Sequence, residues 1–145
     1  MRRVVVLCLL VAACGGTQRP GVELMDDIRM YQEGLRWRKW DEAALRLPPA
    51  RRDAFLETHE ELDAELRIVD YEIERVRLAP GSTVATVQVK YTWHLDSVGV
   101  VHDSIVEQRW RRVNRAWFLV AERLKRGEDF PGLADAGREM SSDPE

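Results

Sequence analysis

The stretch TVATVQVKYTWHLD, residues 83–96, decides the fold of this chain. Its odd positions from Ala85 to Leu95 are all apolar, whereas the even positions between them include Thr86 and His94. Successive side chains of a β-strand point to opposite faces of a sheet, so this alternation predicts a strand with one buried face and one face in water. The flanking segments are therefore the candidates for its partner strands.

The preceding segment, residues 66–78, has a strand pattern that changes phase. Its apolar residues fall on odd positions from Val69 to Ile73 and on even positions after that. One extra residue in a strand shifts the pattern in this way, so we expect a β-bulge near residues 74–75. The APGS sequence at residues 79–82 has proline and glycine where a type II turn requires them, which predicts the connection to the next strand.

The next hairpin is predicted with Val98 and Gly99 at its tip. In this register apolar residues face each other and opposite charges meet on the outer face of the sheet. The expected pairs are Tyr91 with Val106, Val87 with Trp110, Lys90 with Glu107, and His94 with Asp103. A final hairpin around Asn114 and Arg115 pairs Trp110 with Leu119 and Arg112 with Trp117.

Residues 22–46 and 49–64 have the pattern of helices. Apolar residues recur in the first segment at spacings of four, three and four, on one helical face: Leu24, Ile28, Tyr31 and Leu35. Pro48 and Pro49 end that helix and start the next, and Gly34 predicts a bend within the first. The order of elements predicts an α+β fold, with N-terminal helices packed on a curved four-stranded antiparallel sheet in a cone-like half barrel.

The strand segments read LRIVDYEIERVRL, VATVQVKYTWHL and QRWRRVNRAWFLVAE. In this order after two helices, residues 24–124 resemble the nuclear transport factor 2-like superfamily, which includes ketosteroid isomerase and SnoaL-like proteins. The resemblance implies helices over the concave face of the sheet and a pocket between helices and sheet. The residues expected to line this pocket are Tyr31, Tyr91, Trp93 and Trp110.

The resemblance leaves two classes of function open. The favoured class is a binding or protein-interaction domain for a small hydrophobic ligand or another envelope protein. The alternative is an isomerase-like or dehydratase-like enzyme, since ketosteroid isomerase-like members use a carboxylate base with a tyrosine and a second acid. Asp70 and Glu74 could point inward on the bent first strand, with Tyr31 approaching from the helix. No catalytic residue is assigned, because the inward positions of the second and third strands hold no carboxylate.

Four residues near one hairpin tip, His94, Asp96, His102 and Asp103, are of the types that bind zinc. A zinc site requires its ligands to converge on one point, and the predicted register places His94 and Asp103 on the outer face but His102 on the inner face. We therefore expect no metal site. No cofactor is expected either, since the sequence has no glycine-rich phosphate loop and no GxSxG nucleophile motif.

The first residues predict export and lipid anchoring. Arg2 and Arg3 precede an apolar run that ends at Ala13, and residues 1–13 are interpreted as a signal peptide. The sequence VAAC at residues 11–14 resembles the lipobox of bacterial lipoproteins, which predicts lipidation of Cys14. Residues 14–21 then form the lipidated N-terminus and a flexible tether. We expect a membrane-bound protein of the cell envelope, at the outer membrane and facing the periplasm.

Residues 22–125 are predicted to form a single domain, and residues 126–145 a polar tail. The formal net charge of −3 argues against a nucleic-acid partner. The register leaves three apolar side chains on the outer face of the sheet: Ile105, Phe118 and Val120. A soluble monomer usually covers such a patch, so we expect a homodimer through this face, or coverage by Phe130 and Leu133 of the tail.

Overall fold

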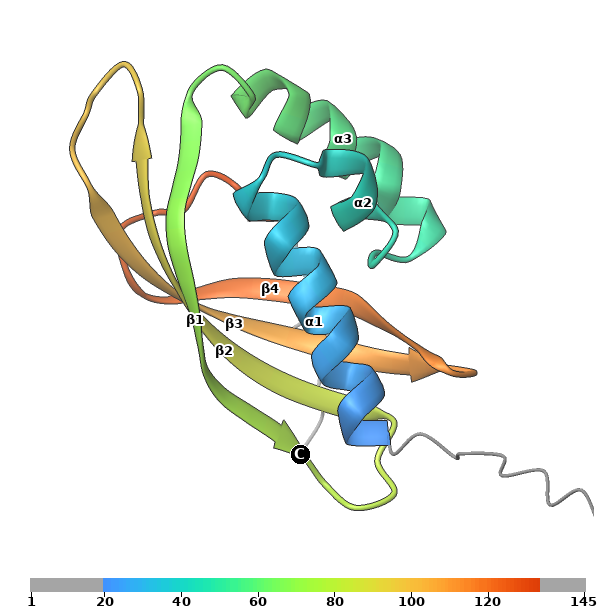
Figure 1. The fold of residues 1–145 in the computed structure, drawn as a ribbon. Coiled ribbons are helices and arrows are strands. Elements are labelled where there is room, and N and C mark those ends of the chain that lie inside the picture. Colours follow the sequence, from blue (N-terminus) through green and yellow to red (C-terminus); the bar gives the residue numbers. More distant parts are fainter. Residues whose placement is uncertain (1–19, 134–145) are drawn as a thin grey trace, which may run out of the picture.

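The computed structural model describes residues 20–133, which form three helices and a four-stranded antiparallel sheet. The helices are α1 (Pro20–Arg36), α2 (Trp40–Ala44) and α3 (Pro49–Leu62), and the strands are β1 (Leu66–Leu78), β2 (Val84–Leu95), β3 (His102–Val113) and β4 (Ala116–Gly127). Figure 1 shows α1 crossing the sheet and α3 at one end of it. The predicted α+β fold, with helices packed on a four-stranded antiparallel sheet, is confirmed.

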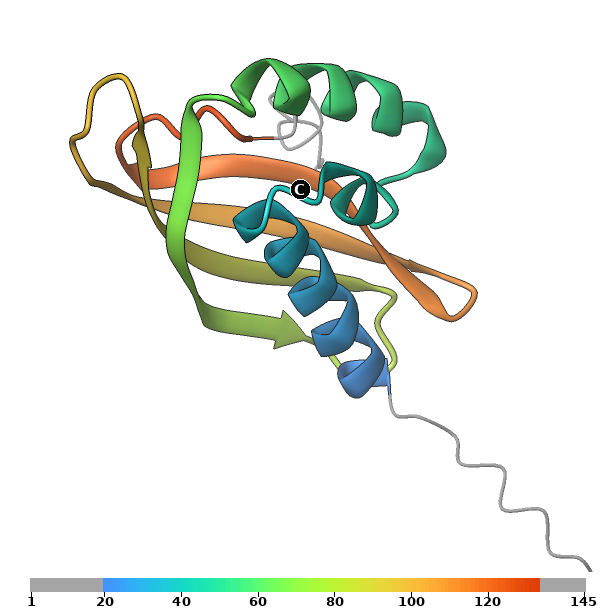
Figure 2. The same ribbon diagram turned by 45° about the horizontal axis from the view of Figure 1, so that its top comes forward.

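The sheet is open, because its strands follow the order β1-β2-β3-β4 and β1 does not pair with β4. Helices α1 and α3 lie on the same side of the sheet (Figure 2). Side chains from this inner side and from the helices form one core. The strand residues in it include all the predicted inner positions: Val87, Val89, Tyr91, Trp93, Val106, Trp110, Trp117 and Leu119.

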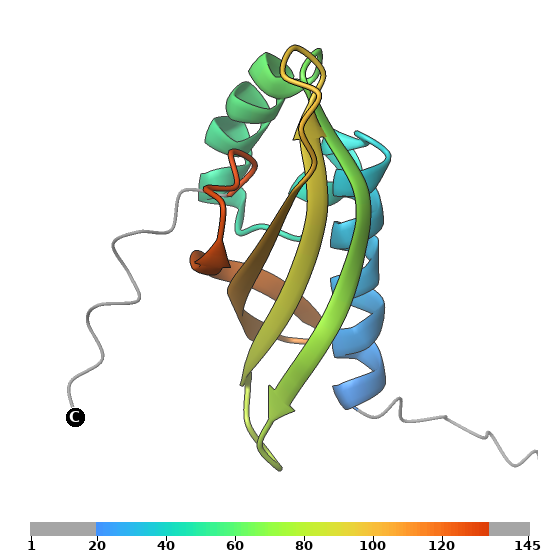
Figure 3. The same cartoon turned by 90° about the vertical axis from the view of Figure 1, so that its left-hand side faces the viewer.

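Strand β1 bends along its length (Figure 3), and it contains two irregularities. The predicted bulge is confirmed, because the pairing with β2 shifts between Ile73 and Arg75. A second shift between Ile68 and Asp70 was not expected. It places Ile68 in the core and leaves Val69 exposed. The sequence could not distinguish the two, because both are β-branched apolar residues and either fits a buried strand position.

The predicted pairing of β2 with β3 is wrong by two residues. Val89, rather than Tyr91, lies opposite Val106, and Tyr91 lies opposite Ser104. The cause is the loop, which extends from residue 96 to residue 101 instead of being a two-residue tip. The amides of Val98 and Gly99 both donate to the Leu95 carbonyl, at 3.1 and 2.8 Å, and Gly99 adopts a left-handed φ of 69°.

The other expected pairs on these strands change in the same way. Val87 lies opposite Gln108, Lys90 opposite Ile105, and Asp103 opposite Thr92 rather than His94. Because side chains alternate with a period of two, a shift by two residues leaves each side chain on its predicted face. The faces of β2 and β3 were therefore predicted correctly although the pairs were not.

The last hairpin has the predicted register at its turn. Trp110 lies opposite Leu119 and Arg112 opposite Trp117, with Asn114 in the turn at a φ of 59°. The pairing then shifts, so that Arg109 lies opposite Ala121 and no residue of β3 lies opposite Val120. This bulge reverses the faces of the residues that follow in β4.

The first predicted helix is two helices in the structure. Helix α1 ends at Arg36, and Arg38 has a φ of 57°, outside the helical region. The chain turns back so that α2 packs against α1 at Gly34, where an added Cβ would lie 2.8 Å from the Cβ of Ala43. Gly34 thus permits a close helix contact rather than a bend. None of the helices within residues 20–133 is long and apolar enough to span a membrane.

The packed part of the chain continues past residue 125. Strand β4 ends at Gly127, and the Phe130 ring stacks on Tyr91 with 4.7 Å between ring centroids. Phe130 therefore packs on the inner side of the sheet and does not cover the outer face. The predicted signal peptide, Cys14 and residues 134–145 lie outside the described residues.

Candidate functional site

A cluster of polar side chains lies in the core between α1 and the sheet. Tyr31 and Gln32 come from α1, Tyr91 from β2, Gln108 from β3 and Glu122 from β4. Each of the five side chains is at most 3% exposed. We call these five residues the core polar cluster.

Hydrogen bonds within this cluster form a connected network. Gln108 Nε2 donates to Glu122 Oε1 at 2.7 Å and to the Tyr91 hydroxyl at 3.1 Å. The Tyr91 hydroxyl donates to Gln32 Oε1 at 2.5 Å, and Gln32 Nε2 donates to Gln108 Oε1 at 3.1 Å. The Tyr31 hydroxyl reaches Glu122 Oε2 at 3.4 Å. Both carboxylate oxygens of Glu122 thus have donors inside the core, as a buried acid requires.

The two tyrosines of the core polar cluster act as neutral donors. Burial raises the pKa of the Tyr31 hydroxyl well above its usual value, and the neighbouring Glu122 carboxylate raises it further. Burial and the same carboxylate also raise the pKa of Tyr91. A phenolate beside Glu122 would place two negative charges in a nonpolar interior, which is unfavourable. Both hydroxyls therefore keep their protons and hold the network together.

Sequence reasoning missed the acid of this cluster. Glu122 faces inward because the bulge at Val120 reverses the faces of β4, and a single inserted residue leaves no distinct signal in the sequence. Asp70 and Glu74, the two acids that the enzyme alternative would need to point inward, are exposed. Asp70 instead forms an ion pair with Arg36 at 3.1 Å.

The four aromatic residues predicted to line a pocket are buried in the core. The rings of Tyr31 and Trp110 pack edge to face with 6.0 Å between their centroids, and the Tyr91 ring stacks on Phe130. Trp93 Nε1 donates a hydrogen bond to Ser104 Oγ at 2.9 Å. Three cavities described within residues 20–133 are lined by other side chains. A pocket role for the four aromatic residues stays a prediction.

A cavity of about 290 Å³ lies between α3 and Leu133. We call it the α3 groove. Its lining residues are Ala50, Arg51, Ala54, Phe55, Thr58, His59 and Leu133. The α3 residues lie on one stripe of the helix, because they recur at intervals of about four. Arg51 Nη1 also donates to the Val120 carbonyl, which ties α3 to the bulge of β4.

His59 is the polar side chain at the buried end of this groove. It is 1% exposed, and its ring stacks on Phe55 at 3.9 Å and lies 4.9 Å from the Trp40 ring. Nδ1 lies 2.8 Å from the Phe55 carbonyl, so Nδ1 carries the proton and Nε2 is an acceptor. Nε2 is buried and has no hydrogen-bond partner within residues 20–133.

Burial of His59 lowers the pKa of its imidazole, against the opposing effect of the Phe55 and Gly132 backbone groups. The ring is therefore neutral near pH 7, and its Nε2 receives no hydrogen bond from residues 20–133. In the sequence His59 stands among charged residues, and nothing there marks it as buried. These charged neighbours hide the stripe of α3, formed by Phe55 and His59, that is buried and packs toward Trp40.

The residues considered for a metal site do not converge. His94 Nδ1 lies 3.5 Å from Asp96 Oδ1, while Asp103 binds Lys90 at 3.1 Å and His102 packs against the Trp93 ring at 4.9 Å. No group of three or more His, Cys, Asp or Glu side chains within residues 20–133 could hold a metal ion.

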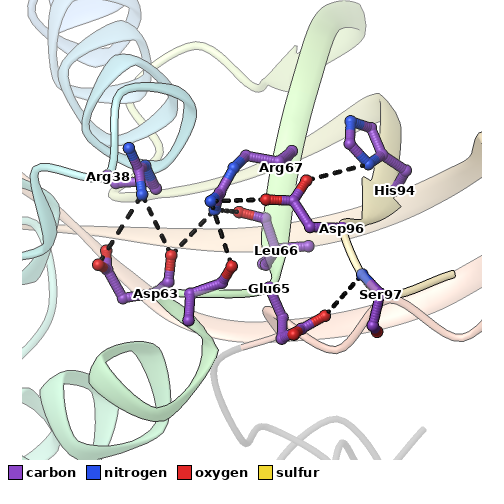
Figure 4. A network of polar contacts seen from close by, with 9 residues as sticks. Arg38, Asp63, Glu65, Leu66, Arg67, His94, Asp96 and Ser97 are labelled. Atoms are coloured by element: carbon purple, nitrogen blue, oxygen red, sulfur yellow. Dashed lines mark hydrogen bonds and ion pairs between the residues drawn. The ribbon is translucent and has the colours of Figure 1, made fainter. Parts of the chain in front are cut away.

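His94 and Asp96 belong to a surface network at the end of the sheet that carries the β2–β3 loop (Figure 4). Arg67 Nη2 lies 2.7 Å from Asp96 Oδ2, and Arg67 Nη1 donates to the Asp63 carbonyl at 2.9 Å. Arg38 Nη1 donates to the same carbonyl at 3.1 Å. We call Arg38, Asp63, Arg67, His94 and Asp96 the loop-end network.

The three apolar residues expected at a dimer interface are half-buried and do not form one patch. Ile105 lies opposite Arg126 near one end of β3, whereas Phe118 lies opposite Arg111, six positions further along β3. At about 3.3 Å per residue this separates them by roughly 20 Å. Val120 occupies the bulge between them. The homodimer itself stays a prediction.

The fold is similar to a solved protein of low sequence identity. The solution structure of RPA3114, a SEC-C motif containing protein from Rhodopseudomonas palustris, matches with a TM-score of 0.55 and 14% identity. The match covers 77% of this chain and 88% of that chain. No family model and no curated protein matches the sequence.

This comparison corrects the expected family. The structural similarity is to a SEC-C motif containing protein, so the assignment to the nuclear transport factor 2-like superfamily is wrong. At 14% identity the similarity concerns the fold alone. No relative supports the lipoprotein assignment, and anchoring through Cys14 stays a prediction.

Proposed function

We propose that this protein is a ligand-binding module of the cell envelope, anchored by a lipid on Cys14, that holds a small hydrophobic ligand in the α3 groove. The observation that carries the proposal is the unpartnered Nε2 of His59 beside a cavity of about 290 Å³. A buried polar atom without a partner has a free-energy cost of about 1 to 3 kcal/mol. A ligand that donates a hydrogen bond to Nε2 would remove this cost.

The lining of the groove indicates the chemistry of the ligand. Ala50, Ala54, Phe55 and Leu133 offer apolar contact, and the volume is near the lower end of that of small-molecule sites. Because Nδ1 of His59 is committed to the Phe55 carbonyl, the imidazole offers only an acceptor. The ligand we infer is a compact apolar molecule that carries one hydroxyl or N–H donor.

The enzyme alternative has less support. Its chemistry needs a carboxylate that can reach a substrate. Glu122 is the one buried acid of the core polar cluster, both of its oxygens accept hydrogen bonds there, and it is absent from the lining of the α3 groove. Binding, rather than isomerisation or dehydration, is therefore the function we infer.

The binding proposal is tested with 1-naphthol, which has one donor, and with naphthalene, which has none. We expect the full chain to bind 1-naphthol about three- to tenfold more tightly, the value of one net hydrogen bond. His59→Phe should remove this difference. Ala54→Phe should fill the groove and abolish binding of both probes, whereas Glu57→Phe, on the exposed face of α3, should leave it unchanged.

Two outcomes would contradict the groove as the binding site. One is equal binding of both probes by the unsubstituted chain, and the other is unchanged binding by Ala54→Phe. A thermal melt of each variant establishes that it is folded. The anchor is tested separately by fatty-acid labelling in cells, which Cys14→Ala should abolish together with membrane fractionation.

A further inference from the structure

The outer face of the sheet, opposite to the helices, carries a basic and apolar surface at one end. In one row across the strands Val84 lies opposite Arg111, and Arg111 lies opposite Phe118. Two rows further along, and again on the outer face, Arg77 lies opposite Thr86. We call the surface formed by Arg75, Arg77, Val84, Arg111, Val113 and Phe118 the tether-end face.

The three arginines of this face are exposed and form no ion pair with any residue of 20–133. Their cross-strand neighbours are Gln88, Thr86, Val84 and Phe118, none of which is acidic. Glu107 lines a small cavity together with Arg75 and Arg77, and its carboxylate is already bound by Arg123 at 2.5 Å and Lys125 at 3.4 Å. The tether-end face is thus a positive surface on a chain whose formal net charge is −3.

Exposed apolar side chains lie among these arginines. Val84 is 39% and Val113 is 49% exposed, and Phe118 is half-buried beside Arg111. Arginine guanidinium groups bind lipid phosphates, while aliphatic and aromatic side chains enter the region between headgroups and acyl chains. The combination is typical of surfaces that lie against an anionic membrane.

The N-terminal segment enters the domain at this same end. Pro20 and Gly21 line a cavity together with the β1–β2 turn and Arg112, and Arg112 Nη2 lies 2.7 Å from Glu23 Oε2. Figure 1 shows the start of α1 beside that turn. Five residues separate Cys14 from Pro20, so the two Cα atoms lie at most about 20 Å apart when the segment is extended. A lipid on Cys14 would hold this end of the sheet at the membrane.

We propose that the tether-end face docks on anionic phospholipid headgroups of the membrane that holds the lipid anchor. This inference rests on the proposed anchoring of Cys14. Docking turns the β2–β3 loop, which lies at the other end of the sheet, away from the lipid (Figure 1). A second copy of the chain fits this face poorly, because a symmetric contact would bring six unpaired arginines together.

The test uses the full chain, expressed in cells and reconstituted into vesicles of phosphatidylcholine alone or of phosphatidylcholine and phosphatidylglycerol in equal parts. A bimane label is attached to Val113→Cys or, as the matched control, to Val100→Cys in the β2–β3 loop. The two positions are 49% and 53% exposed. Brominated lipids quench the label where it reaches the membrane. We expect quenching of the residue 113 label in the anionic vesicles, its reversal by salt, and no quenching of the residue 100 label.

Charge reversal separates docking from anchoring. The double variant Arg77→Glu, Arg111→Glu should lower the ratio of docked to undocked protein by about tenfold or more, while the chain still floats with neutral vesicles. Arg126→Glu is the matched control, because Arg126 is also exposed and lies opposite Ile105, at the far end of the sheet.

Each other outcome overturns a defined part of the inference. Flotation without quenching at position 113, or equal quenching at both positions, overturns the docking face. If the chain does not float with neutral vesicles and bimane reacts with Cys14 itself, the Cys14 thiol is free of lipid. That result overturns the anchor and the docking that rests on it. A label response at position 113 that depends on protein concentration in detergent assigns the face to a second copy instead.

Discussion

Two polar networks of this protein are built from similar hydrogen bonds and differ in their surroundings. The core polar cluster lies under α1 with every side chain at most 3% exposed, whereas the side chains of the loop-end network are exposed by between 27% and 51%. Water can replace any partner lost from the loop-end network but none lost from the core polar cluster. The contribution of each bond to stability therefore follows burial more than geometry.

The largest effect is expected where the core polar cluster meets the apolar core. Trp110 is fully buried, and its Nε1 donates to Gln108 Oε1 at 3.2 Å. Trp110→Ala should lower the free energy of unfolding by about 3 to 5 kcal/mol, because the surrounding strands cannot close the cavity. Denaturant unfolding measures this loss. A loss below about 1 kcal/mol would mean that Trp110 is not packed as the structure has it.

Breaking the core polar cluster should cost less than creating that cavity. Gln108→Leu removes at once the buried hydrogen bonds that Gln108 makes with Glu122, Tyr91 and Gln32. We expect a loss of about 2 to 3 kcal/mol in the free energy of unfolding. The matched control is Gln88→Leu on β2, whose side chain lies on the outer face in contact with water, and it should change stability by less than about 0.5 kcal/mol. Equal losses in the two variants would contradict the importance of burial.

His59 provides a case between the two networks, because it is buried but incompletely bonded. Its pKa is lowered in the folded chain by burial, so below the ordinary imidazole pKa of about 6.5 the unfolded chain binds more protons. Stability should therefore fall as the pH decreases from about 7 toward the lowered pKa. His59→Leu should remove this part of the pH dependence. Thermal melts of both proteins between pH 7 and pH 5 measure it, and parallel curves would contradict a role for His59.

The smallest effect is expected in the loop-end network. Arg67→Ala removes the contact with Asp96 at 2.7 Å, but both side chains are about a third exposed or more. Exposed ion pairs contribute about 0 to 1 kcal/mol, and salt weakens them. Denaturant unfolding at low and high salt should show a loss within that range that shrinks with added salt. A loss comparable to that of Gln108→Leu would erase the distinction between the two networks.

The fold was predictable because its signals are periodic. The alternation in β2, the bulge near Glu74, the APGS turn and the pairing of Trp110 with Leu119 are each visible in a few residues. The pairing of β2 with β3 was not, because the length of a loop sets the register and two-residue shifts leave the faces unchanged. The candidate site escaped prediction for a related reason. Glu122 is buried because of the bulge in β4, and His59 because of the orientation of α3. Neither feature produces a periodic pattern in the sequence.

The two bulges of β1 have a consequence for how the molecule behaves at high concentration. Strand β1 is an edge of an open sheet, with backbone groups that could pair with the edge of another molecule. The irregularities at Val69 and Glu74 interrupt that edge twice within one strand, and Asp70, Glu72 and Arg75 place charges along it. A strand of another molecule could pair with only a short part of this edge, because each bulge shifts the register of the hydrogen bonds. The bend that shapes the core thus also protects the sheet from growing into aggregates.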